Sequence, residues 1–326
     1  MGLIPTVLAI DAGNSKTDVA VVTAGGEVLA TARGGGFRPP AVGVGAAVDA
    51  LAEPVARAFA DAGATTASHV SACLANADLP VEEEQLAAAL HARAWGASVE
   101  VRNDTFAILR AGVPEPRGVA VVCGAGINCV GMRPDGRTAR FPAIGRISGD
   151  WGGGWGLAEE ALWYAARAED GRGPDTLLTG YLISHFGVER VEDVTIGIHK
   201  GKISGDDLTS LAPLLLRAAD EGDQVARTVV SRLADEISVM SITAMRRLGL
   251  TGLATPVVLG GGVVTARNPL LMSGITAQLA AAAPAAEVRV IDVPPVAGAA
   301  LLGLDQVHAP PAAAARLRAA YGVPVP

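Results

Sequence analysis

The chain of 326 residues, with a mass of 32.9 kDa, is too long for one ordinary domain and about right for two. Half of the residues are hydrophobic and 18% are charged, which excludes a disordered protein. The net charge of −7 argues against a general binder of nucleic acid or of an anionic membrane surface.

The cysteines and the first residues bear on where the protein works. Cys73, Cys123 and Cys129 form no CxxC pair and are too few for a disulfide framework, so we expect a reducing, cytoplasmic setting. The opening segment, MGLIPTVLAIDAG, has no basic region and no cleavage site, so we expect no signal peptide. No apolar run reaches about 18 residues, so we expect no membrane span.

The first part of the chain alternates short apolar strands with amphipathic helices. Strands are predicted at residues 7–10, 18–23, 28–32, 68–75 and 98–102. Helices are predicted at residues 44–62 and 81–94, and from Thr105 to Ala111. Residues 113–117, with two prolines, are typical of a linker.

The second part restarts the same order. Strands are predicted at residues 118–122, 127–132, after the turn at 134–137, at 256–259 and at 288–292. Helices are predicted at residues 157–168, 175–186, 206–220, 224–248, 269–282 with Asn268 as N-cap, 296–304 and 310–321. Each part opens with three strands whose first turn is glycine-rich, which predicts two α/β domains with mixed sheets. We place them at residues 1–117 and 118–304, with a helix in 305–326 rejoining the first.

The first glycine-rich turn is Asp11-Ala12-Gly13-Asn14-Ser15-Lys16-Thr17. Backbone amides of a tight turn bind phosphate oxygens, and Lys16, Ser15 and Thr17 add positive charge and hydroxyl donors. Asp11, at the end of a strand, has the oxygen ligands that suit Mg²⁺. An ordinary hairpin turn would not need an acid, an amide, two hydroxyls and one of only three lysines, so we favour phosphate binding.

The corresponding turn of the second part is Cys123-Gly124-Ala125-Gly126-Ile127-Asn128. Gly124 and Gly126 would let phosphates approach the backbone, and Asn128 would hydrogen-bond a polar substrate. On its own the segment is equally consistent with plain turn chemistry.

Asn103 and Asp104 follow a predicted strand, and ligands of open α/β sheets collect beyond such ends. A carboxylate there would orient a substrate hydroxyl and accept its proton. The alternative, that Asp104 caps the helix that follows, stays open at this point.

Two later segments are also rich in glycine. Residues 145–156 hold six glycines, two tryptophans and Asp150, which predicts a loop that closes over a ligand, with Asp150 on sugar hydroxyls or a metal-bound water. Gly260-Gly261-Gly262 follows an apolar strand and would let a flat ring approach the backbone, although an ordinary strand-to-helix turn has the same pattern.

Together these motifs occur in the order expected of the acetate and sugar kinase, Hsc70 and actin superfamily. Within it the chain resembles the BadF/BadG/BcrA/BcrD ATPase family, and especially its N-acetylglucosamine kinase branch. The resemblance extends to the late segment Pro294-Pro295-Val296-Ala297-Gly298-Ala299-Ala300. It implies two ribonuclease-H-like (actin-like ATPase) domains with ATP and Mg²⁺ in the cleft between them.

The resemblance also implies roles for residues. Asp104 would be the base acting on the sugar 6-hydroxyl, and Asp11 and Asp150 would serve the metal. The remaining candidates are Gly13, Asn14, Ser15, Lys16, Thr17, Gly124, Ala125 and Gly126 for phosphates, Gly260, Gly261 and Gly262 for adenosine, and Asn103, Asn128, Gly145 and Asp150 for the sugar.

Two segments depart from the branch. Its members often carry an asparagine where this chain has Gly34-Gly35-Gly36-Phe37-Arg38-Pro39-Pro40, and a Glu-Gly-Ser type sequence where this chain has Trp151-Gly152-Gly153-Gly154. The expected substrate is therefore N-acetylglucosamine or a related amino sugar, with glucosamine and muramic derivatives left open.

We hypothesise that the protein is an ATP-dependent amino-sugar kinase. The resemblance also implies that it forms a homodimer. Two other functions are weighed against it. An activator of a radical dehydratase or reductase would need accessible cysteines for an iron–sulfur cluster, and the three cysteines here fall in or beside predicted buried strands. A sugar or nucleotide sensor would bind ligand without turnover.

Overall fold

The computed structural model describes residues 6–291 and 293–322. Asp292, the last residue of one predicted strand, lies outside them, as do residues 1–5 and 323–326 of the predicted domains. The chain divides into two compact units. The first holds the described residues of 1–120, 130–142 and 291–326, and the second holds 121–129 and 143–290.

The first unit is built on a sheet of five strands in the order β3-β2-β1-β4-β5. The strands are β1 (Thr6–Ala12), β2 (Thr17–Thr23), β3 (Val28–Gly34), β4 (Ala67–Leu74) and β5 (Gly96–Asn103). β2 is antiparallel to both β1 and β3, whereas β1, β4 and β5 are parallel. The predicted mixed sheet is confirmed.

The parallel strands end together. Ala12 lies opposite Leu74, and Leu74 lies opposite Asn103. The residues that follow each strand therefore start from one edge of the sheet, where ligands of such sheets bind. Asp11, Asn76 and Asp104 all come from this edge.

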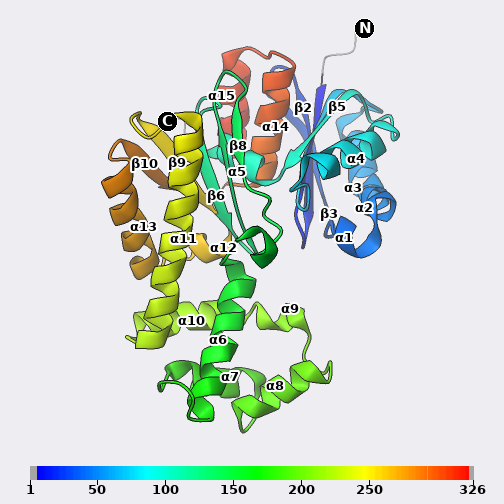
Figure 1. Ribbon diagram of the computed structural model, residues 1–326. Coiled ribbons are helices and arrows are strands. Elements are labelled where there is room, and N and C mark those ends of the chain that lie inside the picture. The colour runs from blue at the N-terminus through cyan, green and yellow to red at the C-terminus, as the bar shows by residue number, and fades with distance from the viewer. Residues whose placement is uncertain (1–5, 292, 323–326) are drawn as a thin grey trace. The chain divides into compact units, whose positions relative to one another are not determined.

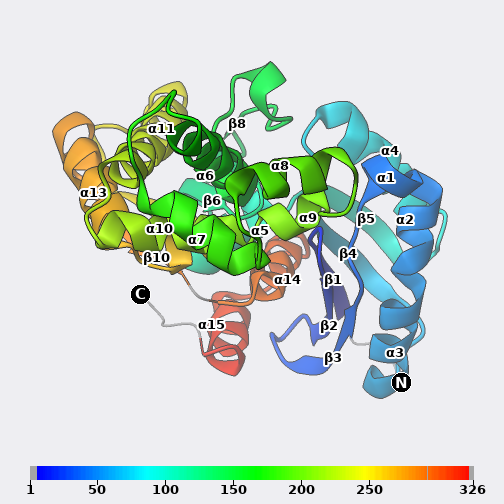
Figure 2. The same ribbon diagram turned by 90° about the horizontal axis from the view of Figure 1, so that it is seen from below.

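Helices cover both faces of this sheet (Figures 1 and 2). They are α1 (Pro39–Val42), α2 (Val44–Ala50), α3 (Ala52–Ala62), α4 (Pro80–His91), α5 (Thr105–Gly112), α14 (Pro295–Gln306) and α15 (Pro311–Ala320). The single helix predicted at 44–62 is two helices. Pro54 has no amide hydrogen, so it fits the first turn of α3 but not the middle of a longer helix.

Helix α14 belongs to the first unit, whereas the sequence prediction extended the second domain to residue 304. Small residues bring it close. A Cβ on Gly298 would lie 1.8 Å from the carbonyl oxygen of Ala107 in α5. The hydroxyl of Ser71 in β4 donates a hydrogen bond to Ala299 O at 2.7 Å. The small-residue segment of α14 therefore packs on the first sheet and on α5.

The second part of the chain forms a sheet in the order β10-β9-β6-β7-β8. Its strands are β6 (Gly118–Cys123), β7 (Ile127–Met132), β8 (Thr138–Arg140), β9 (Thr255–Gly260) and β10 (Ala286–Val290). β9 and β10 are parallel and β7 and β8 are antiparallel, so this sheet is also mixed. Its strand order repeats that of the first sheet, and the predicted second mixed sheet is confirmed.

The second unit carries most of the helices of this part (Figure 1). They are the 3-10 helix η1 (Arg146–Ser148), α6 (Gly153–Glu169), α7 (Leu177–Phe186), α8 (Val191–His199), α9 (Gly205–Leu208), α10 (Leu211–Asp220), α11 (Gln224–Leu248), α12 (Gly262–Thr265) and α13 (Pro269–Ala282). Asn268 caps α13 as predicted, since its Oδ1 accepts the Leu271 amide at 3.0 Å. Helix α8 was not predicted, and the helix predicted at 206–220 is two, α9 and α10. Within the described residues, no helix is both long enough and apolar enough to cross a bilayer.

Candidate active site

The β1–β2 turn presents polar groups to solvent. The Gly13 amide donates to Lys16 O at 2.9 Å, which closes the turn. Asn14, Ser15 and Lys16 are exposed. The Lys16 ammonium lies 3.2 Å from the Asp18 carboxylate on β2, so its charge is held beside the turn. The exposed amides, hydroxyl and cation suit an anionic ligand.

The loop after β3 packs against this turn. The Phe37 amide donates to Gly13 O at 2.9 Å, and a Cβ on Gly36 would lie 2.3 Å from Asn14 O. Thr17 is buried, and its hydroxyl donates to Gly35 O at 2.8 Å. Its hydroxyl hydrogen, one of the expected phosphate donors, is therefore used to hold the loop.

Sequence reasoning missed Asn76. This residue follows β4 and has a φ of 61°, a conformation that asparagine tolerates better than most residues. Its Nδ2 donates to Asn14 Oδ1 at 2.9 Å and to Phe37 O at 3.3 Å. It thereby fixes both the turn and the loop. Its position after a buried parallel strand, like that of Asp104, was the signal that could have found it.

Asp11 is buried, with 7% of its surface exposed, at the end of β1. Burial raises the pKa of its carboxyl well above the ordinary value, and the nearby Asp104 and Asp18 carboxylates raise it further. A divalent cation would offset that cost, because it prefers carboxylate oxygens. Asp11 therefore fits the expected metal position. Among residues 6–291 and 293–322, no three acidic, histidine or cysteine side chains form a ready-made metal cage.

Asp104 begins α5, but its side chain makes no capping hydrogen bond. Instead, Asn103 Oδ1 accepts the Thr105 amide at 3.0 Å. Asn103 Nδ2 donates to Asp78 Oδ1 at 2.8 Å, so the amide expected to bind sugar is engaged within the fold. Burial raises the pKa of the Asp104 carboxyl to about 6. Such a carboxyl exchanges a proton readily near neutral pH.

Arg140 of β8, which sequence reasoning also missed, holds the segments near Asp104 in place through hydrogen bonds. Its Nη1 donates to Glu83 Oε2 at 2.6 Å, and the other oxygen of Glu83 accepts the Asn103 amide at 3.0 Å. Its Nη2 donates to the carbonyls of Ala77 and Asp78, at 3.1 and 3.2 Å. One guanidinium thus connects the segment that precedes Asp104, through Glu83, to the segment that follows β4.

In the second unit, the Gly124–Gly126 turn meets the start of α6. The Gly154 amide donates to Gly124 O at 2.7 Å, and the Trp155 amide donates to Ala125 O at 3.0 Å. Gly153 has a φ of 73°, and a Cβ there would lie 2.5 Å from the Gly126 backbone. The glycines at 152–154 therefore serve close packing and the start of α6, where the sequence predicted a loop that closes over a ligand and a helix from residue 157.

The glycines of the β9–α12 turn and of the β6–β7 turn differ in whether packing requires them. A Cβ on Gly261 would lie 2.5 Å from the carbonyl of Cys123, so Gly261 brings the β9–α12 turn against the β6–β7 turn. Gly124 and Gly126 have no positive φ, and a Cβ on either would meet nothing within 4 Å. Nothing in the fold requires glycine at these two positions, which leaves the space beside them for a ligand.

Four predicted site residues line one cavity of about 260 Å³: Ala125, Gly126, Gly145 and Asp150. Asp150 is buried, its amide donates to Gly145 O at 3.2 Å, and its carboxylate accepts a hydrogen bond from the Ser148 hydroxyl. Trp155 and Glu159 also line the cavity, although neither was among the predicted site residues. Asn128 does not line it, and its Oδ1 accepts the Cys129 amide at 2.7 Å.

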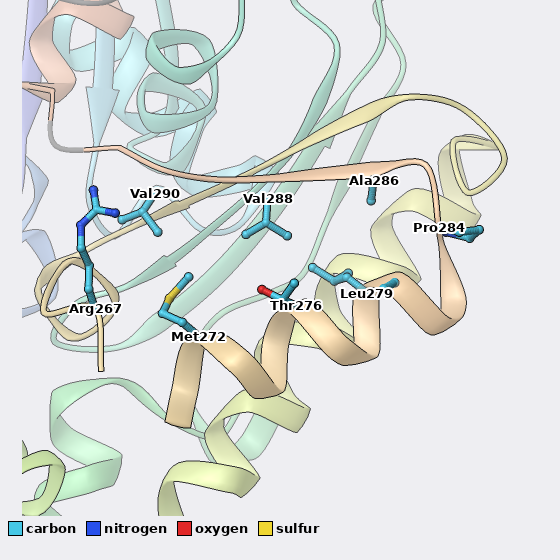
Figure 3. A pocket seen from close by; sticks show the side chains of 9 residues that line it. Arg267, Met272, Thr276, Leu279, Pro284, Ala286, Val288 and Val290 are labelled. Atoms are coloured by element: carbon cyan, nitrogen blue, oxygen red, sulfur yellow. The ribbon is translucent and has the colours of Figure 1, made fainter. Parts of the chain in front are cut away.

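A separate hollow of about 360 Å³ lies between α13 and β10. Its walls are mainly apolar, with Arg267 at one end and Pro284 at the other (Figure 3). It contains none of the predicted site residues.

A model of the BadF/BadG/BcrA/BcrD ATPase family matches residues 8–303. Two curated relatives match most of the chain. The N-acetylmuramic acid/N-acetylglucosamine kinase of Clostridium acetobutylicum is 24% identical over 81% of this chain and 87% of its own. The N-acetyl-D-glucosamine kinase of Dictyostelium discoideum is 25% identical over 91% of this chain and 97% of its own.

The fold is also that of a solved protein from Chromobacterium violaceum, assigned as an N-acetylglucosamine kinase. The superposition has a TM-score of 0.71, covers 92% of this chain and 99% of that one, and pairs residues that are 22% identical. The superposition covers nearly all of this chain, so the two proteins share one fold.

Proposed function

The chain belongs to the BadF/BadG/BcrA/BcrD ATPase family, and we propose that it is an ATP-dependent kinase that phosphorylates a hydroxyl of an amino sugar. N-acetylglucosamine is the first candidate acceptor and its 6-hydroxyl the first candidate position. The observation that carries the proposal is Asp104, a carboxyl with a pKa raised to about 6 that has no capping role. The curated relatives, both kinases of N-acetylated sugars, support the choice of acceptor.

In the proposed reaction Asp104 hydrogen-bonds the acceptor hydroxyl and takes its proton as the hydroxyl oxygen bonds to the γ-phosphorus. The bond from that phosphorus to the bridging oxygen breaks, and ADP leaves with the electron pair. Lys16 and the amides of the β1–β2 turn hold the phosphates in the first unit, and Gly124 and Gly126 give phosphates room in the second. The adenosine is proposed to contact Gly260, Gly261 and Gly262.

We propose Mg²⁺ as the metal, served by Asp11 and Asp150. When bound, it neutralises charge on the phosphate oxygens. The burial of both carboxylates supports the assignment, because a buried anion is stabilised by a cation beside it. Gly145 and Asp150 are proposed to contact the sugar. For Asn103 and Asn128, the hydrogen bonds that they make within the fold favour a structural role.

We further propose a cytoplasmic homodimer. Cys73, Cys123 and Cys129 are free thiols, which suits a reducing compartment. Exposed apolar side chains on helices of the second unit, among them Ile196 and Val239, suit a partner surface. Light scattering would give a mass twice 32.9 kDa for a dimer. The burial of all three cysteines also speaks against an exposed iron–sulfur cluster, and so against the activator function.

The test is ADP release with Mg²⁺-ATP across N-acetylglucosamine, glucosamine, N-acetylmannosamine, N-acetylmuramate, glucose and no sugar. The proposal expects release that depends on one amino sugar, with a sugar phosphate as product. Release without sugar, or ATP binding without any release, would contradict it.

A further inference from the structure

A second cavity adjoins the one that contains Asp150. It has a volume of about 490 Å³ and is lined by Arg146, Glu159, Glu160, Trp163, Tyr164 and Arg232. Arg146 and Glu159 also line the Asp150 cavity. The two cavities therefore share a boundary within the second unit.

Trp151 forms part of that boundary. Trp151 lines the Asp150 cavity and is 7% exposed. Its Nε1 donates to Glu160 Oε1 at 3.2 Å, and the Arg232 guanidinium lies 4.0 Å from its ring centroid; both of these partners line the second cavity. A group bound against Trp151 in the first cavity is thus next to the side chains of the second.

The second cavity has the side chains that bind carbohydrate. Trp163 is 50% exposed, although a large aromatic ring gains from being covered. Arg167 lies 4.5 Å from its ring centroid and Tyr164 stands edge-on to it at 4.7 Å, so the ring is held in place. A sugar ring offers an apolar face to such a platform, and its hydroxyls suit nearby carboxylates and guanidinium groups.

The charges favour a neutral occupant. Arg232 lies 3.6 Å from Glu160, so its charge is already compensated. The lining contains two arginines and two glutamates, which leaves no net positive charge to select a carboxylate. A neutral second sugar ring therefore fits this cavity better than an acidic substituent such as a lactyl group.

We propose that this cavity is a subsite for a second sugar ring, and that the acceptor is an amino-sugar disaccharide or glycoside. The inference rests on the proposed function, because it takes the Asp150 cavity as the acceptor site. The transfer step is unchanged: one acceptor O–H bond and one phosphoanhydride bond break, one P–O bond forms, and the proton goes to Asp104.

The test compares kcat/KM for N-acetylglucosamine with N,N′-diacetylchitobiose, and for glucosamine with its β-1,4 disaccharide. In the wild type the disaccharide is expected to be about tenfold better, mainly through a lower KM, as one aromatic stacking contact provides. Trp163→Ala is expected to abolish this preference and leave the monosaccharide within about twofold.

Tyr181→Ala is the matched control, because Tyr181 on α7 also stacks with an arginine, Arg217 at 4.8 Å, but lines neither cavity. It should change neither ratio. Monosaccharide turnover without a disaccharide preference, or an equal loss on both acceptors in Trp163→Ala, would overturn the subsite and leave the kinase intact. No sugar-dependent release on any acceptor would overturn the kinase and the subsite together.

Discussion

The side-chain oxygen of Asn103 accepts the backbone amide of Thr105 at 3.0 Å. This bond satisfies an amide at the start of α5 that would otherwise need another acceptor. Asp104, between the two residues, makes no capping bond, and its partly buried carboxylate stays available. The arrangement separates two tasks: Asn103 starts the helix, and Asp104 is left for chemistry.

Arg140→Met should lower kcat about tenfold and leave the sugar KM within about twofold. Removal of the guanidinium leaves Glu83 partly buried without its cation, and Glu83 holds the amide of Asn103 next to Asp104. Steady-state kinetics over a range of sugar concentrations separates the two constants.

Arg137→Met is its control, since Arg137 lies on the same hairpin, is exposed and pairs with Asp135. Thermal unfolding of both variants checks that the fold persists. Equal kcat values for the two variants would show that Arg140 does not position the base.

Gly124→Ala should raise the ATP KM about tenfold with little change in thermal stability. Its Cβ meets open space in the fold, so the cost falls on the proposed phosphate. Gly153→Ala should show the opposite pattern, with lower thermal stability and little change in the ATP KM. Its Cβ would strike the Gly126 backbone at a φ of 73°, which costs at least about 2 kcal/mol and lowers Tm by roughly 4–8 °C. If Gly124→Ala bound ATP normally, the turn would not be a phosphate site.

The pH dependence of kcat/KM should follow the ionisation of the Asp104 carboxyl. A base must be ionised, and burial raises its pKa to about 6. Activity should therefore fall tenfold for each pH unit below about 6 and level off above it. Profiles at saturating ATP, with unfolding monitored at each pH, would test this. A plateau that extends unchanged to pH 4.5 in folded enzyme would contradict the assignment.

Asp104→Asn should stabilise the protein at neutral pH. The folded-state pKa lies above the ordinary value of 3.8, so ionisation costs more in the folded than in the unfolded state. The wild type should lose stability as pH rises from about 4 to 6, and the variant's Tm advantage should be present above 6 and absent below 4. Calorimetry at pH 4 and pH 8 measures the Tm difference between the variant and the wild type. A variant that is more stable only at low pH would contradict a raised pKa of Asp104.

The strands, most helices and the two mixed sheets could be predicted because buried strands are short runs of apolar residues, such as Val7-Leu8-Ala9-Ile10. The turn at residues 13–16 and the Asp104 edge followed from where those strands end. What escaped prediction depends on tertiary contacts. Asn76 matters only because it reaches Asn14, and Arg140 only because it reaches Glu83.

Glycine was the least informative residue in the sequence. Backbone packing requires glycine at Gly153 and Gly261 but not at Gly124 and Gly126. The sequence alone does not distinguish a glycine needed for packing from one that leaves space open. The helix start at Gly153 was missed for this reason. Asn103 was expected on the sugar from its place after a strand and from the resemblance, and only its partners, Asp78 and Thr105, show its use in the fold.

Asp104 as the base of a sugar-dependent phosphoryl transfer can be tested in the Asp104→Asn variant. Its sugar-stimulated ADP release should be measured beside the wild type, on the amino sugar that the wild type uses, with ATP binding measured by calorimetry. We expect a loss of roughly 10³-fold in kcat with ATP affinity retained. Turnover within a fewfold of the wild type would contradict it.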